Sequence, residues 1–478
     1  QPRSRGLGDV YKRQGTVYVI FQLDTEDFVT PEADDVLLDL AEIFEKYGIR
    51  ASFAIVGEKA RALRRRGRWD VIRALRAHDI AYQSNYHSLH PTIAEQLRDS
   101  GWEDGVKLII EREGPGLRDL EEIFGQRPSA YIQPGGDWAP QVPYAMRELG
   151  IQVYADGIFE PQPHWFCGVL AIRYALHFDE RRASEPSYLS EVKTRFEELY
   201  RSLREEGGVI VVVLHPCMLR TEEFWDAVNF ARGAMPAQPR PAPLCREEEY
   251  RARLRAFEEF VALVAGHEGV KVITYRELPG LYREPEVELT SSDLRVLAER
   301  LIEQPSSHII HGKPVSLAEA FYALSYSLRT YLERGALPKE VKPYFTLGPL
   351  RAPLRHRKGF RVEVRRVVEA AAAAYDELIN RRAVPAEITV GGRRAGPLSL
   401  LIAMARAYLA VLEDSTGSVE VPATDEEPEF PNRDFRSRVT RQWGWVIFPE
   451  GFSSRRILEL TLSQLWTLKP AILGISQQ

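Results

Sequence analysis

The sequence predicts an α/β protein: a distorted β/α barrel of about seven parallel strands, followed by a mainly helical C-terminal domain. β-Branched and aromatic runs alternate with amphipathic helical segments up to residue 282. Parallel strands need a covering helix between them, so this alternation indicates parallel pairing. The strand segments expected are 15–23, 50–56, 80–82, 130–132, 152–155, 209–214 and 270–274.

The chain of 478 residues is long enough for two or three domains. Residues 1–14 (QPRSRGLGDVYKRQ) contain no methionine, no apolar segment and no periodicity, so we expect a non-native leader that takes no part in the fold. Residues 15–282 form the predicted barrel domain, and residues 283–478 form the predicted helical domain.

The C-terminal part contains a weak internal repeat. Residues 307–312 (SHIIHG) precede one helical segment, and residues 386–391 (AEITVG) precede another. A short strand, a glycine turn and a helix in each copy indicate a duplicated module. The repeat resembles the archaeal pseudomurein-binding repeats; the alternative is a helical packing domain that covers the barrel or joins two copies into a homo-oligomer.

Composition excludes several classes of partner and site. The net charge is -5, so no overall positive field favours nucleic acid. Three cysteines are too few for a disulfide framework or a cysteine-rich zinc site. No run of about 18 apolar residues predicts a membrane span. With no signal peptide visible, the cytoplasm is the default compartment, and the cell surface is the alternative if a signal has been lost.

Polar and ionisable side chains follow several of the predicted strands, where a parallel barrel gathers its functional groups. Such groups are costly to bury unless they are paired or bound to metal. Carboxylates and imidazoles together suit a divalent ion such as zinc. The residues at strand ends are Asp24, Glu26, Asp27, Gln83, His87, His90, Gln133, Asp137, Trp138 and His215.

Five segments then resemble one known family, the polysaccharide deacetylases of carbohydrate esterase family 4. The segments occur in the family's order and spacing, and together they cover about residues 15–278. They are 18–27 (YVIFQLDTED), 78–91 (HDIAYQSNYHSLHP), 131–138 (YIQPGGDW), 214–216 (LHP) and 270–278 (VKVITYREL). The resemblance implies a metal-dependent hydrolase that removes an N-acyl group, commonly N-acetyl, from a glycan or another N-acylated sugar.

The resemblance also implies roles for individual residues. Asp24 matches the general base that activates water, and His215 matches the general acid that protonates the leaving amine. Either Glu26 or Asp27 matches the acidic metal ligand, and His87 matches a histidine ligand.

Three further residues are candidates for substrate binding. They are Gln133, Asp137 and Trp138, which follow the strand at 130–132. For Asp137 and Trp138, a structural role in packing is the alternative to contact with a sugar ring.

Two positions depart from the family pattern. Gln83 stands where the first histidine ligand belongs, although His90 lies three residues after His87 and could supply the missing ligand. Ile132 stands where an arginine usually braces the catalytic aspartate. These departures keep two other functions open: a catalytically inactive glycan-binding homologue, and a hydrolase of small amides resembling allantoinase.

Each candidate residue also has a structural alternative. Asp24 and Asp27 could form a strand-end turn or cap a helix. His87 and His90 could be loop histidines bonded to the backbone, and His215 could serve only to orient its loop.

Overall fold

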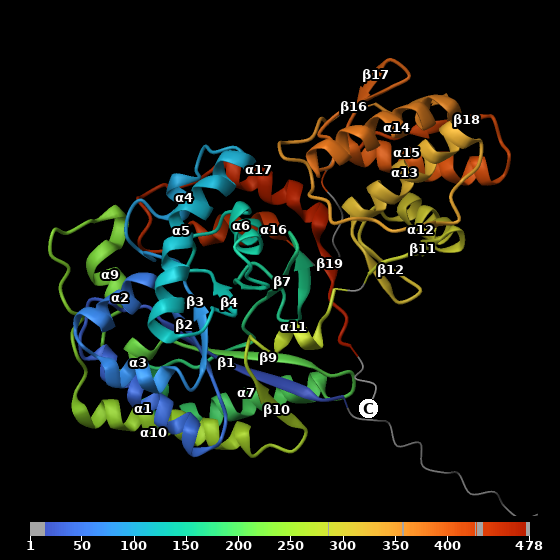
Figure 1. Cartoon of the computed structure of the whole chain (residues 1–478). Coiled ribbons are helices and arrows are strands. Elements are labelled where there is room, and N and C mark those ends of the chain that lie inside the picture. The colour runs from blue at the N-terminus through green and yellow to red at the C-terminus, as the bar shows by residue number, and fades with distance from the viewer. Residues whose placement is uncertain (1–14, 285, 356–357, 426, 428–433, 475–478) are drawn as a thin grey trace, which may run out of the picture.

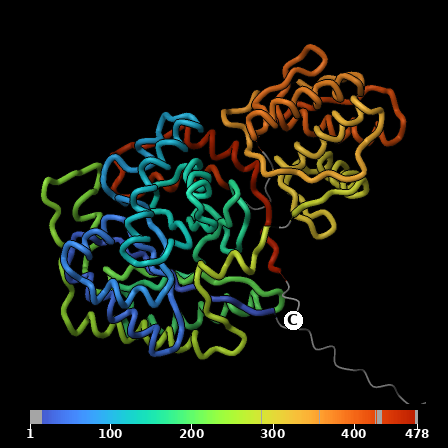
Figure 2. The backbone as a smooth tube through the Cα atoms, viewed as in Figure 1, coloured from blue at the N-terminus to red at the C-terminus, as the bar shows by residue number. Residues whose placement is uncertain are grey.

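The computed structural model describes residues 15–284, 286–355, 358–425, 427 and 434–474. The predicted leader, residues 1–14, lies outside these ranges. Figure 1 shows a large β/α body built from the N-terminal part of the chain and a smaller helical body built from residues coloured yellow to orange. The tube view shows the last coloured segment of the chain running back across the larger body (Figure 2).

The large body is organised around a curled sheet whose strands are mostly parallel, which confirms the predicted fold class. Within the described residues the sheet has 11 strands in the order β19-β6-β7-β5-β4-β3-β2-β1-β9-β8, and β10 also pairs with β1. The predicted strands are observed as β1 (Val17–Thr25), β2 (Ser52–Ile55), β3 (Asp79–Tyr82), β4 (Ala130–Ile132), β5 (Val153–Ala155), β9 (Gly208–Leu214) and β10 (Val270–Ile273).

Helices cover the sheet and bury its apolar side chains (Figure 1). The long ones are α1 (Ala33–Lys46), α5 (Trp102–Phe124), α7 (Tyr188–Leu203) and α10 (Glu247–Ala265). Shorter ones are α2 (Gly57–Arg65), α3 (Trp69–Leu75), α4 (Ile93–Gln96), α6 (Gln141–Glu148), α8 (Pro216–Arg220), α9 (Trp225–Phe230) and α11 (Leu278–Leu281). No helix in the described part of the chain is both long and apolar enough to cross a membrane.

Three short strands were not expected from the sequence. β6 (His164–Phe166) and β7 (Val169–Ile172) form a hairpin, and β8 (Leu176–His177) pairs with β9. The hairpin turns at Cys167 and Gly168, both with positive φ. Runs of two to four residues carry too little periodicity to distinguish a strand from a loop.

The smaller body contains two copies of one arrangement, each with a strand, a helix, a hairpin, a second helix and a closing strand. The first copy is β11 (Leu289–Thr290), α12 (Ser291–Glu303), β12 (His308–Ile310), β13 (Lys313–Val315), α13 (Leu317–Arg334) and β14 (Glu340–Val341). The second is β15 (Phe360–Glu363), α14 (Val364–Arg381), β16 (Ile388–Val390), β17 (Arg393–Ala395), α15 (Pro397–Leu412) and β18 (Ser418–Val421). In both copies the first and last strands pair antiparallel, as expected of a duplication.

The copies pack crosswise, with α13 against α14 and α12 against α15, and share a hydrophobic core separate from that of the barrel. The chain then returns to the barrel through α16 (Phe435–Gln442), α17 (Arg455–Gln464) and β19 (Lys469–Pro470), which pairs with β6. Apolar residues of α16 and α17 belong to the barrel core. We therefore propose that residues 435–470 be counted with the barrel domain.

Candidate active site

Five of the candidate residues converge where β1, β3 and β9 end. Asp24 is the penultimate residue of β1, and Glu26 directly follows that strand. Gln83 and His87 come from the loop after β3, and His215 is the residue before α8, directly after β9. The β3 loop bends sharply, since His87 has a φ of 50° and donates its backbone N–H to Ser84 Oγ at 2.9 Å. Parallel strands thus bring residues far apart in sequence to one edge.

Glu26, His87 and Gln83 form a fully buried cluster in which none of the three side chains is more than 3% exposed. Glu26 Oε2 lies 2.7 Å from His87 Nε2 and accepts a hydrogen bond from Gln83 Nε2 at 3.3 Å. Glu26 Oε1 and Gln83 Oε1 nevertheless lack a hydrogen-bond partner, and His87 Nε2 has the ion-pair contact with Glu26. Burial opposes ionisation of both groups, but their mutual attraction lowers the pKa of Glu26 and raises that of His87. Buried donor atoms left in this state fit a bound cation.

Gln22 and Tyr275, and not an arginine, hold Asp24 in place. Its Oδ1 accepts a hydrogen bond from Gln22 Nε2 at 2.8 Å, and Gln22 Oε1 accepts one from the hydroxyl of Tyr275 at 2.7 Å. Burial raises the pKa of Asp24 to about 6, despite the nearby charge of His215. Asp24 therefore remains a base near neutral pH. Gln22 and Tyr275 take over a bracing function that Ile132 cannot supply.

His215 is paired with Glu180, a residue that sequence reasoning did not select. His215 Nδ1 lies 3.3 Å from Glu180 Oε1, which also accepts the backbone N–H of His215. Burial favours the neutral imidazole, but the Glu180 carboxylate raises the pKa of His215 to about 10. Burial also opposes ionisation of Glu180, but His177 and His215 lower the pKa of Glu180 to about 2. His215 Nε2 lies 3.8 Å from Asp24 Oδ2. A carboxylate base and a protonated imidazole thus face each other.

His177 completes a second group that could hold a metal ion. Its Nε2 lies 3.6 Å from Glu180 Oε2, and one ligand atom from each of His177, Glu180 and His215 lies within 4.8 Å of the others. His177 and Glu180 were missed because His177 ends β8 and Glu180 follows it, and β8 is a strand of two residues with no sequence signal. A His-x-x-Glu spacing after a short apolar run is the only sequence feature that could have indicated them.

The mouth of the barrel holds a cavity of about 310 Å³. Asp24 and His215 open into it, together with the exposed ring of Tyr174 and the side chain of Gln133, which accepts a hydrogen bond from Tyr154. The remaining lining residues include Gln22, Ile132, Gly135, Ala155, Asp156, Gly157, His177, Val213 and Gln442. The lining is mostly polar, so it suits a polar ligand more than an apolar one.

Four candidates lie outside this cluster and have partners of their own. Asp27 Oδ1 accepts the backbone N–H groups of Val29 and Thr30, both at 2.9 Å. His90 Nδ1 lies 2.7 Å from Glu95 Oε2, and its Nε2 lies 3.1 Å from the Phe230 carbonyl. Among the described residues, neither Asp27 nor His90 forms a hydrogen bond or ion pair with Glu26, Gln83 or His87, although Asp27 Oδ2 is also buried without a hydrogen-bond partner.

Asp137 and Trp138 also serve the surrounding structure. Asp137 accepts the backbone N–H groups of Ile93 and Ala94, at 2.9 and 2.6 Å, at the start of α4. Trp138 is completely buried, and its indole N–H donates to Thr461 Oγ1 of α17 at 2.9 Å. Neither side chain reaches the cavity, so we leave both out of the proposed substrate contacts.

Comparisons with known proteins give matches among solved structures. No protein-family model matches the chain, and no curated protein does. The similar structures include deacetylases. A peptidoglycan deacetylase from Bacillus subtilis has 13% identity and a TM-score of 0.30, covering 55% of this chain and 91% of that one. A peptidoglycan N-acetylglucosamine deacetylase has 12% identity and a TM-score of 0.31, covering 55% and 92%. An allantoinase has 16% identity and a TM-score of 0.39, covering 55% and 90%.

Proposed function

We propose that this protein is a metal-dependent hydrolase that removes an N-acyl group, and specifically an N-acetyl group, from a glycan or N-acylated sugar. The observation that carries the proposal is the buried cluster of Glu26, His87 and Gln83, in which Glu26 Oε1 and Gln83 Oε1 have no hydrogen-bond partner and His87 Nε2 faces Glu26 Oε2 at 2.7 Å. This cluster adjoins an aspartate and a histidine whose pKa values lie far apart. Environments that separate two titratable groups in this way are typical of an acid–base pair.

Glu26, His87 and the carbonyl oxygen of Gln83 would hold the metal. These residues offer a carboxylate, an imidazole nitrogen and an amide oxygen, a set that zinc accepts. A bound zinc ion would supply Lewis-acid polarisation of the scissile carbonyl and of the attacking water. Zinc is our proposal for the ion, because imidazole is among its preferred ligands.

Asp24 acts as general base and takes a proton from the attacking water as the new carbon–oxygen bond forms. His215 enters the reaction protonated and gives its proton to the amide nitrogen as the carbon–nitrogen bond breaks. The products are a free amine on the sugar and a carboxylic acid. Gln22 with Tyr275, and Glu180, hold the two reacting side chains in place.

A non-catalytic glycan-binding protein is the second candidate. Gln83 favours it, because its amide N–H already donates to Glu26 where a second imidazole ligand would otherwise bind the ion. Hydrolysis of a small amide is a third, and the modest cavity volume of about 310 Å³ favours it over a long polymer.

Metal analysis combined with an activity assay separates these functions. We expect the purified chain to bind about one zinc ion and to release acetate from N-acetylglucosamine or its linear oligomers. His87→Ala should lose both the ion and the activity. His90→Ala is the matched control, because His90 is three residues away and bonded to Glu95 and Phe230. Loss of the ion in His177→Ala but not in His87→Ala would move the metal to the second group.

A further inference from the structure

Asp156 is a buried carboxylate that the proposed chemistry does not use. It follows β5, lines the mouth cavity and is 6% exposed. Its Oδ1 accepts the backbone N–H of Ile158 and the side-chain amide of Gln442, both at 2.9 Å. Its Oδ2 is buried and has no partner. A carboxylate oxygen left without a donor in a cavity is a feature that a ligand's hydroxyl or N–H group would satisfy.

Gln442 is a rigid part of the cavity wall although it comes from the C-terminal end of α16. Arg438, one helical turn earlier, donates to the carbonyls of Ile158 and Phe159 at 2.9 and 3.1 Å and pairs with Glu160 at 2.8 Å. On the other side, a Cβ atom at Gly136 would lie 2.1 Å from the Gln442 carbonyl. The absence of a side chain there allows the returning chain to pack directly on the barrel mouth.

We infer that Asp156, positioned by Gln442, is a substrate-binding residue that accepts a hydrogen bond from a hydroxyl or N–H group of a single N-acylated sugar unit. This inference rests on the proposed function and specifies its substrate class. Asp156 is a binding residue with no part in proton transfer. The returning segment therefore contributes to the active site and does not only cover the barrel.

The size and chemistry of the cavity support one sugar unit as the ligand. Its volume of about 310 Å³ is at the lower end of ligand cavities. Gln133, Asp156 and Gln442 supply hydrogen-bonding groups, and the exposed ring of Tyr174 supplies an apolar face for a pyranose. Burial raises the pKa of Asp156 to about 7, so near neutral pH this carboxyl group can either accept or donate a hydrogen bond. The substrate is then a free amino sugar or the terminal unit of a chain.

Calorimetric titration of the full chain with N-acetylglucosamine and with its linear tetramer tests this inference. We expect both sugars to bind within threefold of each other, because only one unit enters the cavity. Asp156→Ala should weaken binding of the monosaccharide at least tenfold and raise KM while kcat stays within about threefold. Gln442→Ala should have a smaller effect in the same direction, and Asp156→Asn should restore part of the affinity through its remaining acceptor.

Arg441→Ala is the matched control, because Arg441 precedes Gln442, is exposed and bonds only to Ser437 within α16. Unchanged binding in Asp156→Ala, or a tetramer bound more than tenfold tighter than the monosaccharide, would overturn the inference. If wild-type protein binds the monosaccharide through Asp156 but releases no acetate, the proposed function fails while the inference stands. If it binds neither sugar, both are wrong.

Discussion

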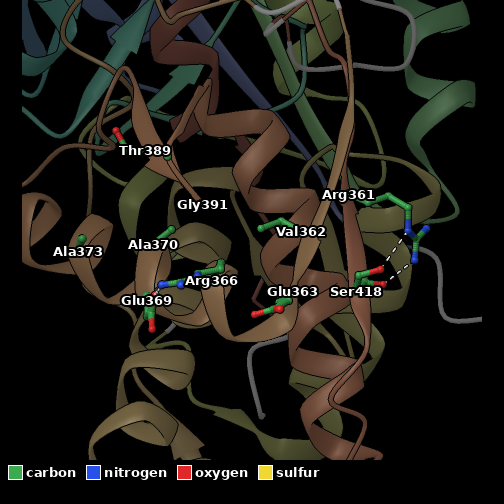
Figure 3. A pocket seen from close by; sticks show the side chains of 11 residues that line it. Arg361, Val362, Glu363, Arg366, Glu369, Ala370, Ala373, Thr389, Gly391 and Ser418 are labelled. Carbon is green, nitrogen blue, oxygen red and sulfur yellow. Dashed lines mark hydrogen bonds and ion pairs between the residues drawn. The ribbon is translucent and has the colours of Figure 1, made fainter.

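Two hollows in the described part of the chain differ in what their side chains leave unsatisfied. The larger, of about 860 Å³, lies in the second repeat between α14, the β15–β18 pair and the β16–β17 turn (Figure 3). Its two arginines have partners and are open to solvent: Arg361 donates to Ser418 Oγ at 3.2 Å and to its carbonyl at 2.6 Å, and Arg366 donates to Glu369 at 2.9 Å. The smaller hollow, at the barrel mouth, is lined by the buried carboxylates of Asp24 and Asp156, and Asp156 Oδ2 has no hydrogen-bond partner.

The first repeat shows how the larger hollow arises. There, Asp293 lies 2.6 Å from His311 Nδ1 and accepts a hydrogen bond from Lys313 at 2.8 Å, so side chains fill the space. In the second repeat, the corresponding positions on the helix and the turn hold Arg366 and Gly391. His311 and Gly391 share the same left-handed backbone, with φ of 46° and 55°. The larger hollow thus coincides with a glycine where the first repeat has a histidine, whereas the smaller one contains costly buried carboxylates, which are the better sign of chemistry.

Replacing the proposed general base, Asp24, should have the largest effect and tests this comparison most directly. Asp24→Asn should lower kcat for release of acetate about 10³-fold, since general base catalysis contributes roughly 10²–10⁴-fold. Arg361→Ala combined with Arg366→Ala should leave kcat within twofold, because these residues belong to β15 and α14, and α14 is part of the smaller body (Figure 1). Acetate release and circular dichroism check both variants. A repeat variant that lost activity while Asp24→Asn kept it would reverse the assignment.

The junction between the two bodies should matter for stability. Lys469 in β19 is 3% exposed and pairs with Glu319 of α13 at 2.6 Å and with Glu284 at 3.0 Å. Lys469→Ala leaves Glu319 buried without its cation, and we expect unfolding to become easier by about 3 kcal/mol. Thermal unfolding measures the effect.

The control for the junction is a surface pair on the second repeat. Arg365 pairs with Glu369 at 3.1 Å, but its side chain is 79% exposed, so Arg365→Ala should leave the Tm unchanged. Equal Tm values for the Lys469 and Arg365 variants would show that the junction contributes nothing.

The third prediction concerns Glu180, which positions the acid. Glu180→Gln should lower kcat roughly 10–100-fold with little change in KM, because His215 loses the carboxylate that orients it and keeps it protonated. The loss of stability should be about 1–3 kcal/mol. An unchanged kcat would mean that His215 does not act as the acid.

The stability difference between wild type and Glu180→Gln should depend on pH. The pKa of Glu180 is lowered to about 2, so its contribution is present above pH 4.5 and is lost as pH falls from 4.5 towards 2. The pKa of His215 is raised to about 10, so its contribution is complete below pH 6.5 and is lost as pH rises from 6.5 towards 10. The difference in Tm should therefore be largest between pH 4.5 and 6.5, and a flat profile would contradict the pairing.

The long strand segments of the sequence were enough to predict the fold. The polar residues at the ends of those strands were enough to predict the cluster at the barrel mouth. Asp24, Glu26, His87 and His215 meet because each follows or ends a strand of the parallel sheet, which needs no knowledge of distant contacts. Gln442 could not be predicted, because it reaches Asp156 across 286 positions of sequence and depends on how the chain returns.

Asp137 and His90 illustrate the opposite limit of sequence reading. Both lie at strand ends or in the adjoining loops, as functional residues do. Their side chains instead bond to neighbouring backbone groups and to Glu95, and residue type alone does not distinguish those two outcomes.

The smallest effects should come from alanine substitutions at two adjacent glycines of the larger hollow. Comparing the two variants distinguishes backbone strain from steric contact. Gly391 and Gly392 both have positive φ, of 55° and 79°. A Cβ atom at Gly392 would meet open space, so Gly392→Ala should lose only the left-handed preference, about 1 kcal/mol. At Gly391 a Cβ atom would lie 2.7 Å from Val362 Cγ2, so Gly391→Ala should lose more, about 2 kcal/mol. Urea unfolding gives both values, and acetate release should stay at the wild-type rate in each. A fall in activity in either variant would show that the second repeat acts on the barrel mouth and that the two hollows are coupled.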